Sequence, residues 1–166
     1  MFHHDHFKSE RQRVERVLQI LEDLAARLEA RGSVPSTLLG DVVEFVRATE
    51  AAAYEASQSD EEGPTLSACV EQHVAARVPV NGMQEALLSM RRGEPTAAPR
   101  FAEFARKYAS LRRDHMRFDD RLFANDGVPT KAPDTAGTEE NPESPTTQRI
   151  YERLIKSSRA LHEAGA

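Results

Sequence analysis

The chain has 166 residues, of which 39% are hydrophobic and 30% charged, and its formal net charge is −5. This length suits one domain with a substantial core, and no apolar run approaches the ~20 residues of a membrane-spanning helix. The single cysteine, Cys69, excludes an internal disulfide framework and any metal site built from several cysteines.

The negative charge is concentrated in one stretch. Residues 125–147 contain five acidic residues and one lysine, which leaves the rest of the chain close to neutral. We therefore expect no basic surface of the kind that binds nucleic acid. The first ten residues lack the basic-then-apolar pattern of a signal peptide. The sequence thus predicts a cytoplasmic protein with no nucleic-acid partner and no membrane partner.

The first two segments between prolines and glycines are predicted helices. The first runs from about residue 7 to residue 31 and ends at Gly32, and the second begins at residues 33–36 and fades at residues 57–60. Apolar residues recur in both at three- and four-residue steps, which is typical of an amphipathic helix. The stripes are Val14, Leu18, Leu21, Ala25 and Leu28, then Leu38, Val42, Phe45, Thr49 and Ala52.

Two further helices are predicted after Gly63 and around Pro99. Pro79 lies inside the third segment, where the missing backbone donor predicts a kink. The third stripe contains Leu66, Cys69, Val70, His73, Arg77, Val80, Met83 and Leu87. The fourth contains Phe101, Phe104, Ala105, Tyr108, Leu111, His115, Phe118, Asp119 and Leu122.

Residues 125–147 are rich in Pro, Thr, Glu and Gly and predict a flexible acidic linker. Residues 148–166 predict a short C-terminal helix with a few apolar anchors. No strand alternation is present. The sequence therefore predicts an all-α fold: an up-down-up-down four-helix bundle over residues 1–124, with an extra C-terminal helix after the linker.

Polar residues occupy positions on the predicted inner faces. His73 lies on the third stripe, while His115 and Asp119 lie one turn apart on the fourth. Glu55 lies one turn beyond the second stripe, and Arg11 extends the first. Burying such groups costs several kcal/mol unless they are paired or bound to metal. They therefore predict either a hydrogen-bonded polar interior or a metal site of the kind built between bundle helices.

A family resemblance favours the second interpretation. Residues 101–123, FAEFARKYASLRRDHMRFDDRLF, closely resemble the last bundle helix of hemerythrin-like (HHE cation-binding) domains, which has a tyrosine, a histidine, an acid four residues later and then Leu-Phe. The first three segments are less specifically similar, through Glu10-Arg11, residues 45–55 and Glu71-Gln72-His73. The resemblance covers about residues 8–124.

The family binds two irons through histidines from each helix and two bridging carboxylates. At the matching positions, the resemblance implies Glu55, His73, His115 and Asp119 as metal ligands. Arg11 and Ala51 stand where the family has histidines that serve the same iron. A complete di-iron site is therefore not expected, and the implied cofactor is one iron or another divalent ion. We hypothesise that the Arg11 guanidinium replaces the lost metal charge between Glu55 and Asp119.

Three functions remain open at this point. The first is a hemerythrin-like protein with an incomplete di-iron site that binds one divalent ion, with a small diatomic molecule or a protein as its ligand. The second is a metal-free interaction or signalling bundle, and the third is a peroxide- or nitric-oxide-consuming iron enzyme. The missing histidines disfavour the enzyme. His3, His4 and His6 are expected to be solvated, and Cys69 is expected to be a small core residue.

Overall fold

The computed structural model describes residues 2–58, 64–125 and 145–164, with side-chain surroundings described for residues 11–55, 71–118 and 145–164. These residues form five helices: α1 (Phe2–Glu29), α2 (Ser36–Gln58), α3 (Pro64–Arg91), α4 (Ala97–Asn125) and α5 (Pro145–Ala164). No strand occurs among them, so the all-α prediction is confirmed. None of these helices is long and apolar enough to cross a membrane.

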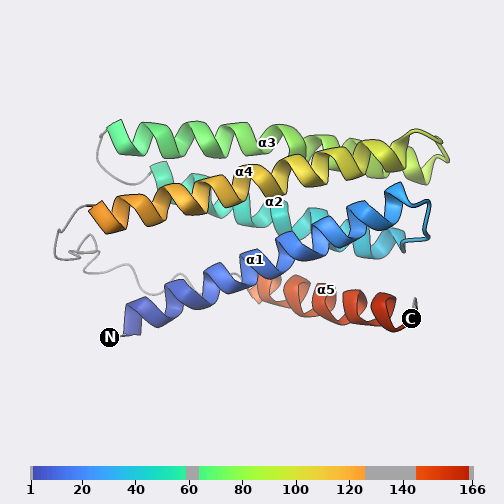
Figure 1. Ribbon diagram of the computed structural model, residues 1–166, viewed down its shortest axis with the longest axis horizontal. Helices are drawn as coiled ribbons and strands as arrows, with labels where there is room; N and C mark the ends of the chain where they lie inside the picture. The colour runs from blue at the N-terminus through green and yellow to red at the C-terminus, as the bar shows by residue number, and fades with distance from the viewer. Residues whose placement is uncertain (1, 59–63, 126–144, 165–166) are drawn as a thin grey trace.

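Successive helices run in opposite directions along the long axis of the molecule (Figure 1). Helix α4 packs against both α1 and α3, and α2 packs against α3 and α5. Helix α5 also reaches α1, because the Arg27 guanidinium donates a hydrogen bond of 3.3 Å to the carbonyl of Leu161. The predicted C-terminal helix therefore packs on the other helices. It begins at Pro145, three residues earlier than expected, and the predicted linker lies mostly outside the described residues.

The ends of α1 and α3 share one backbone arrangement. The Gly32 amide donates to the Arg27 carbonyl at 2.8 Å and the Arg31 amide to the Leu28 carbonyl at 3.1 Å, which is the Schellman pattern. Arg31 takes the left-handed conformation, with φ of 58°. The sequence predicted the helix to run to about residue 31, two residues beyond its end at Glu29. After α3 the left-handed residue is Gly93, with φ of 79°, where a glycine carries no steric penalty.

The helices share one hydrophobic core. The whole predicted stripe of α1 is buried, and Ile150 and Leu154 of α5 join the same cluster. The apolar stripe of α3 was expected to continue through Arg77. Ala76 is buried there instead, whereas Arg77 is exposed, with its guanidinium carbon 4.1 Å from the centre of the Tyr54 ring. The helix continues through Pro79, and the kink expected at this proline stays a prediction.

A close approach of α3 to α4 depends on Gly82. A Cβ atom placed on Gly82 would lie 2.6 Å from three ring carbons of Phe104. Real Cβ atoms do not approach neighbours so closely, so any larger residue would force the two helices or the ring to move. The absence of a side chain at Gly82 therefore sets the spacing of the helices that carry His73 and His115.

Helix α2 is buried on two faces. Leu38, Val42 and Phe45 lie on one of them, and the Phe45 ring lies 5.9 Å from the Tyr151 ring of α5. The other face continues through residues that are three or four positions apart, and it faces α3 and α4. Its members are Leu39, Val43, Val46 and Glu50.

Candidate functional site

Polar side chains from three helices meet inside the bundle. Glu50 of α2 is 4% exposed and His73 of α3 is 6% exposed. Tyr108 of α4 is also buried, while Arg112 and His115 follow it on the same helix and are partly buried. The α4 residues are spaced by four and three positions, so they share one face. We call Glu50, His73, Tyr108, Arg112 and His115, together with Gln72, the polar core.

The Glu50 carboxylate is the centre of the polar core. Its Oε2 accepts a hydrogen bond of 3.1 Å from His73 Nδ1, and its Oε1 accepts one of 2.7 Å from the Tyr108 hydroxyl. Burial alone would raise the pKa of Glu50, but the hydrogen bonds from His73 and Tyr108 and the charge of Arg112 outweigh it and hold this pKa below its usual value. Glu50 is therefore an ionised carboxylate inside the bundle.

Tyr108 and Arg112 complete the surroundings of this carboxylate. Burial and the neighbouring Glu50 charge raise the pKa of Tyr108 well above its usual value, so Tyr108 stays protonated and donates. The Arg112 Nε atom lies 3.8 Å from Glu50 Oε1, within ion-pair distance. This Nε is buried and makes no hydrogen bond to any described residue. The polar core thus contains one buried negative charge and one permanent positive charge.

His115 lies beside His73. The centroids of the two imidazole rings are 4.8 Å apart, in an edge-to-face arrangement. The Nδ1 atom of His115 is hydrogen-bonded to the Gln72 side-chain oxygen, which accepts. Burial, with the nearby Arg112 charge, lowers the pKa of His115 to about 4. His115 is therefore neutral at pH 7, with the proton on Nδ1 and a lone pair on Nε2.

The predicted site residues are distributed unevenly. The structure brings the His73 and His115 rings together, whereas Glu55 is exposed on α2. Arg11 is half-buried on α1, and its role as a charge substitute stays a prediction. The side chain of Asp119 lies outside the described residues, as do those of Cys69, His3, His4 and His6.

The α2 positions of the implied di-iron site lie outside the polar core. The di-iron arrangement that the resemblance implies needs ligands on α2 at positions 51 and 55, and both residues are exposed there. Where side chains are described, no three His, Cys, Asp or Glu residues form a group that could hold a metal ion. Within those ranges, His73 and His115 are the predicted ligands whose rings the structure brings side by side.

Sequence reasoning missed Glu50 and Arg112. Glu50 continues the apolar steps of Leu39, Val43 and Val46, but the stripe chosen for α2 was the face that packs on α5. Arg112 lies four residues after Tyr108 and three before His115, a spacing that marks it as inward-facing. Extending the α4 stripe through its charged positions would have found Arg112, whereas Glu50 lies on the second buried face of α2, which the chosen stripe did not include.

Comparisons of this chain with models of protein families, with curated proteins and with solved structures found no match.

Proposed function

We propose that this protein is a divergent hemerythrin-like domain, an up-down-up-down bundle of α1 to α4, whose polar core binds one divalent metal ion through His73 and His115. The observation that carries the proposal is the adjacent pair of imidazoles, each with Nδ1 hydrogen-bonded to an oxygen. Metal-bound histidines almost always donate their second ring N–H to a carboxylate, carbonyl or water, which orients the ring and fixes its tautomer. Glu50 and Gln72 supply those acceptors here.

The protonation state of the site supports the same proposal. Metal binding requires a neutral imidazole, and the low pKa of His115 supplies one at pH 7 without competition from a proton. Asp119, one turn after His115, is the carboxylate ligand that the resemblance suggests. Two histidines and a carboxylate suit Fe(II), Mn(II) or Zn(II). A bound ion would act as a Lewis acid, with open positions for a small diatomic ligand.

A metal-free interaction or signalling bundle is the second candidate, and one observation favours it. The Arg112 guanidinium, 3.8 Å from Glu50, already balances the buried carboxylate. In that case the polar core would fix the packing of α2, α3 and α4, and function would reside on the protein surface.

Metal content separates the two candidates. We expect the protein expressed in iron-supplemented medium to contain about one metal ion per chain by elemental analysis, and the metal-free protein to bind one Fe(II) or Zn(II) in a calorimetric titration. His73→Ala and His115→Ala should each abolish this binding. Two controls should retain it: His162→Ala on the exposed side of α5, and the triple replacement of His3, His4 and His6 by alanine.

Failure of the wild-type protein to take up any ion would support the metal-free bundle. Binding that survives both His73→Ala and His115→Ala, but is lost when the N-terminal histidines are replaced, would move the site to the N-terminus and contradict the proposal.

A further inference from the structure

The outward face of α3 presents an apolar stripe. Among the described residues, the exposed large hydrophobic side chains are Val74, Val78 and Leu88, which are 49%, 59% and 45% exposed, and all three lie on α3. Asn81 and Glu85 are exposed between them. Helix α3 lies at one edge of the bundle (Figure 1) and packs against α2 and α4 with its other side. We call these five exposed residues the outer stripe.

The outer stripe has the spacing of a contact between two helices. Its five positions follow one another at alternating steps of four and three residues, as the inward positions of a coiled coil do. They cover fourteen residues of α3 from Val74 to Leu88, which is about 21 Å along the helix. A second helix laid along α3 would therefore cover the whole stripe.

We infer that the outer stripe is a self-association surface, on which α3 of a second copy of this chain packs in the antiparallel direction. This inference goes beyond the proposed function and does not depend on the metal site. In a two-fold dimer, one patch contacts its own copy. With the two-fold axis at Asn81, Val74 lies opposite Leu88 of the second copy, because these residues lie seven positions before and after Asn81.

Charge complementarity favours a second copy in this direction. Arg77 and Glu85 are both exposed, and they lie four residues before and four residues after Asn81. Antiparallel helices therefore bring Arg77 of each copy to the level of Glu85 of the other. Parallel helices would instead place Glu85 beside Glu85 and Arg77 beside Arg77, which is unfavourable.

Asn81 would fix the alignment of the two helices. Its side-chain amide can both donate and accept a hydrogen bond, so two copies that meet at the axis can satisfy each other. A single polar residue in an otherwise apolar helix contact specifies its register. A contact between one helix of each copy is smaller than a standard interface, so we expect a weak dimer with a dissociation constant in the micromolar range.

Sedimentation equilibrium of the full-length chain tests self-association. We expect the average mass of the metal-free protein to rise from that of a monomer toward that of a dimer between about 1 µM and about 1 mM. Val78→Asp places a charge inside the contact and should weaken association by about tenfold or more. Ser110→Asp is the matched control, because it adds the same charge at an exposed position of α4. Circular dichroism shows that each variant is folded.

Charge reversal tests the pairing of Arg77 with Glu85. Glu85→Arg alone should weaken the dimer, because it places two positive charges at the same level. Adding Arg77→Glu in the same chain restores opposite charges and should recover the association. A double variant that associates no better than Glu85→Arg would contradict this pairing.

Cysteine cross-linking tests the direction of the helices. Cys69→Ser removes the native cysteine, and copper–phenanthroline serves as the oxidant. In this background Asn81→Cys should form a disulfide-linked dimer, because the two Cα atoms meet at the axis. Val74→Cys and Leu88→Cys should form a disulfide with each other when mixed, but neither should link to itself.

The outcomes decide the inference independently of the metal site. A wild-type protein that stays monomeric at every concentration overturns it and assigns the outer stripe to a different partner. A dimer that Val78→Asp leaves unchanged overturns it as well, because the contact then lies elsewhere. Self-linked Val74→Cys would show parallel helices and contradict the proposed arrangement. Metal content is measured separately, so failure of one proposal leaves the other standing.

Discussion

Glu50 requires three neighbours at once, because a buried ionised carboxylate is stable only when donors and positive charge surround it. His73 and Tyr108 supply the hydrogen bonds, and Arg112 supplies the charge. Each of these residues lies on a different turn or a different helix. The carboxylate therefore couples α2, α3 and α4 at a single point.

Removal of the carboxylate should be costly. Glu50→Ala would leave Arg112 as an uncompensated buried charge and would leave His73 and Tyr108 without their acceptor, so we expect a loss of about 3–5 kcal/mol in the free energy of unfolding. Chemical denaturation of the metal-free protein measures it. Glu55→Ala, an exposed position on the same helix, should change stability by only about 0.5 kcal/mol. Equal losses for the two variants would contradict the placement of Glu50 in the core.

His115 predicts a pH dependence with a definite sign. Its pKa of about 4 in the folded protein lies below the ordinary value of 6.5, so the unfolded chain takes up the proton first as the pH falls. The stabilising effect of the neutral ring is complete above pH 6.5 and is lost progressively down to about pH 4. The lowered pKa of Glu50 acts only below about 4.5.

Between pH 6.5 and 4.5, His115→Gln should therefore lose less stability than the wild type when both are measured by denaturant unfolding without metal. A glutamine does not titrate, so the difference between the two pH profiles isolates His115. Superimposable profiles would show that His115 is solvated and has an ordinary pKa.

Part of the candidate site was predictable residue by residue. His73 and His115 were found because each lies at helical spacing on an apolar stripe, where a buried histidine needs a partner. Glu50 was not found, because an amphipathic pattern allows two neighbouring inward faces, and only the tertiary packing of α5 shows which face of α2 it covers. Arg112 was not found because its neighbour Leu111, which is only half-buried, fits the apolar pattern equally well.

At the scale of the helices, the contact between α3 and α4 is set by Gly82. Gly82→Ala should destabilise the protein by about 1–3 kcal/mol, since its methyl group would overlap the Phe104 ring. Gly40→Ala on α2 is the matched control. Its nearest neighbour would be the Arg91 Nη2 atom at 3.6 Å, an ordinary contact, so the better helix propensity of alanine should raise stability by up to about 1 kcal/mol. Thermal melts that show the same sign for both changes would contradict this helix spacing.

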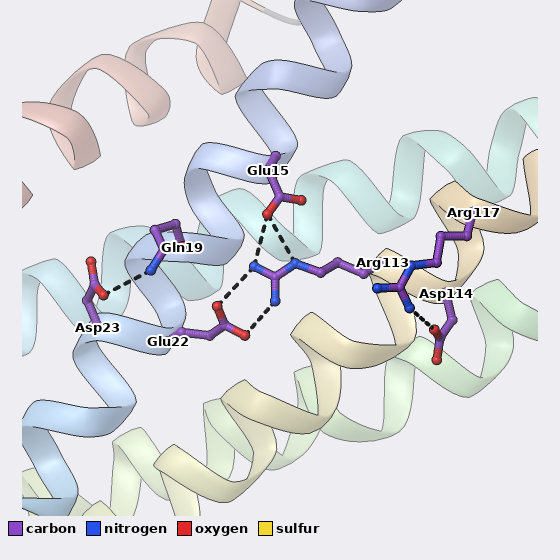
Figure 2. Close-up of polar contacts among 7 residues, drawn as sticks. All are labelled: Glu15, Gln19, Glu22, Asp23, Arg113, Asp114 and Arg117. Carbon is purple, nitrogen blue, oxygen red and sulfur yellow. Dashed lines mark hydrogen bonds and ion pairs between the residues drawn. The ribbon is translucent and has the colours of Figure 1, made fainter. Parts of the chain in front are cut away.

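The α1–α4 pair is held at its surface by ion pairs (Figure 2). Arg113 of α4 reaches between two glutamates of α1, with hydrogen bonds of 2.5 and 2.9 Å to Glu22 and of 3.0 and 3.1 Å to Glu15. Arg106, seven residues earlier, pairs with Glu29 at 2.5 Å. The arginines and the glutamates both repeat every seven residues, which keeps each set on one side of its helix.

The row of ion pairs between α1 and α4 should make the stability of the protein depend on the salt concentration. The hydrogen bonds that Glu22 accepts from Arg113 lower the pKa of Glu22, which indicates a favourable interaction. We expect Arg113→Met to cost about 1 kcal/mol in low salt and less in 1 M NaCl, where screening acts within a few Å. Arg117→Met, whose surface pair with Asp114 lies within one helix, should show almost no loss. Denaturation at the two salt concentrations decides whether these ion pairs stabilise the α1–α4 contact or are surface charges without effect on stability.

For the whole molecule, sequence periodicity predicted the all-α class and the approximate position of each helix. Local signals suffice for this, because prolines, glycines and the spacing of apolar residues act within one helical turn. The packing of α5 against α2 was not predictable in the same way. Its anchors, Ile150 and Leu154, show that it buries a face, but the sequence does not show which helices receive it.

We propose that His73 and His115 form one metal site in which both Nδ1 atoms donate hydrogen bonds to protein acceptors. Long-range ¹H–¹⁵N NMR of the imidazole rings tests it most directly, before and after addition of one equivalent of Zn(II). We expect the metal-free His115 ring at pH 7 to carry its proton on Nδ1 and the His73 ring to carry a proton on Nδ1 toward Glu50, and we expect Zn(II) to shift both Nε2 resonances together at a one-to-one ratio. Rings protonated on Nε2, or Nε2 resonances that do not move when Zn(II) is added, would contradict the account.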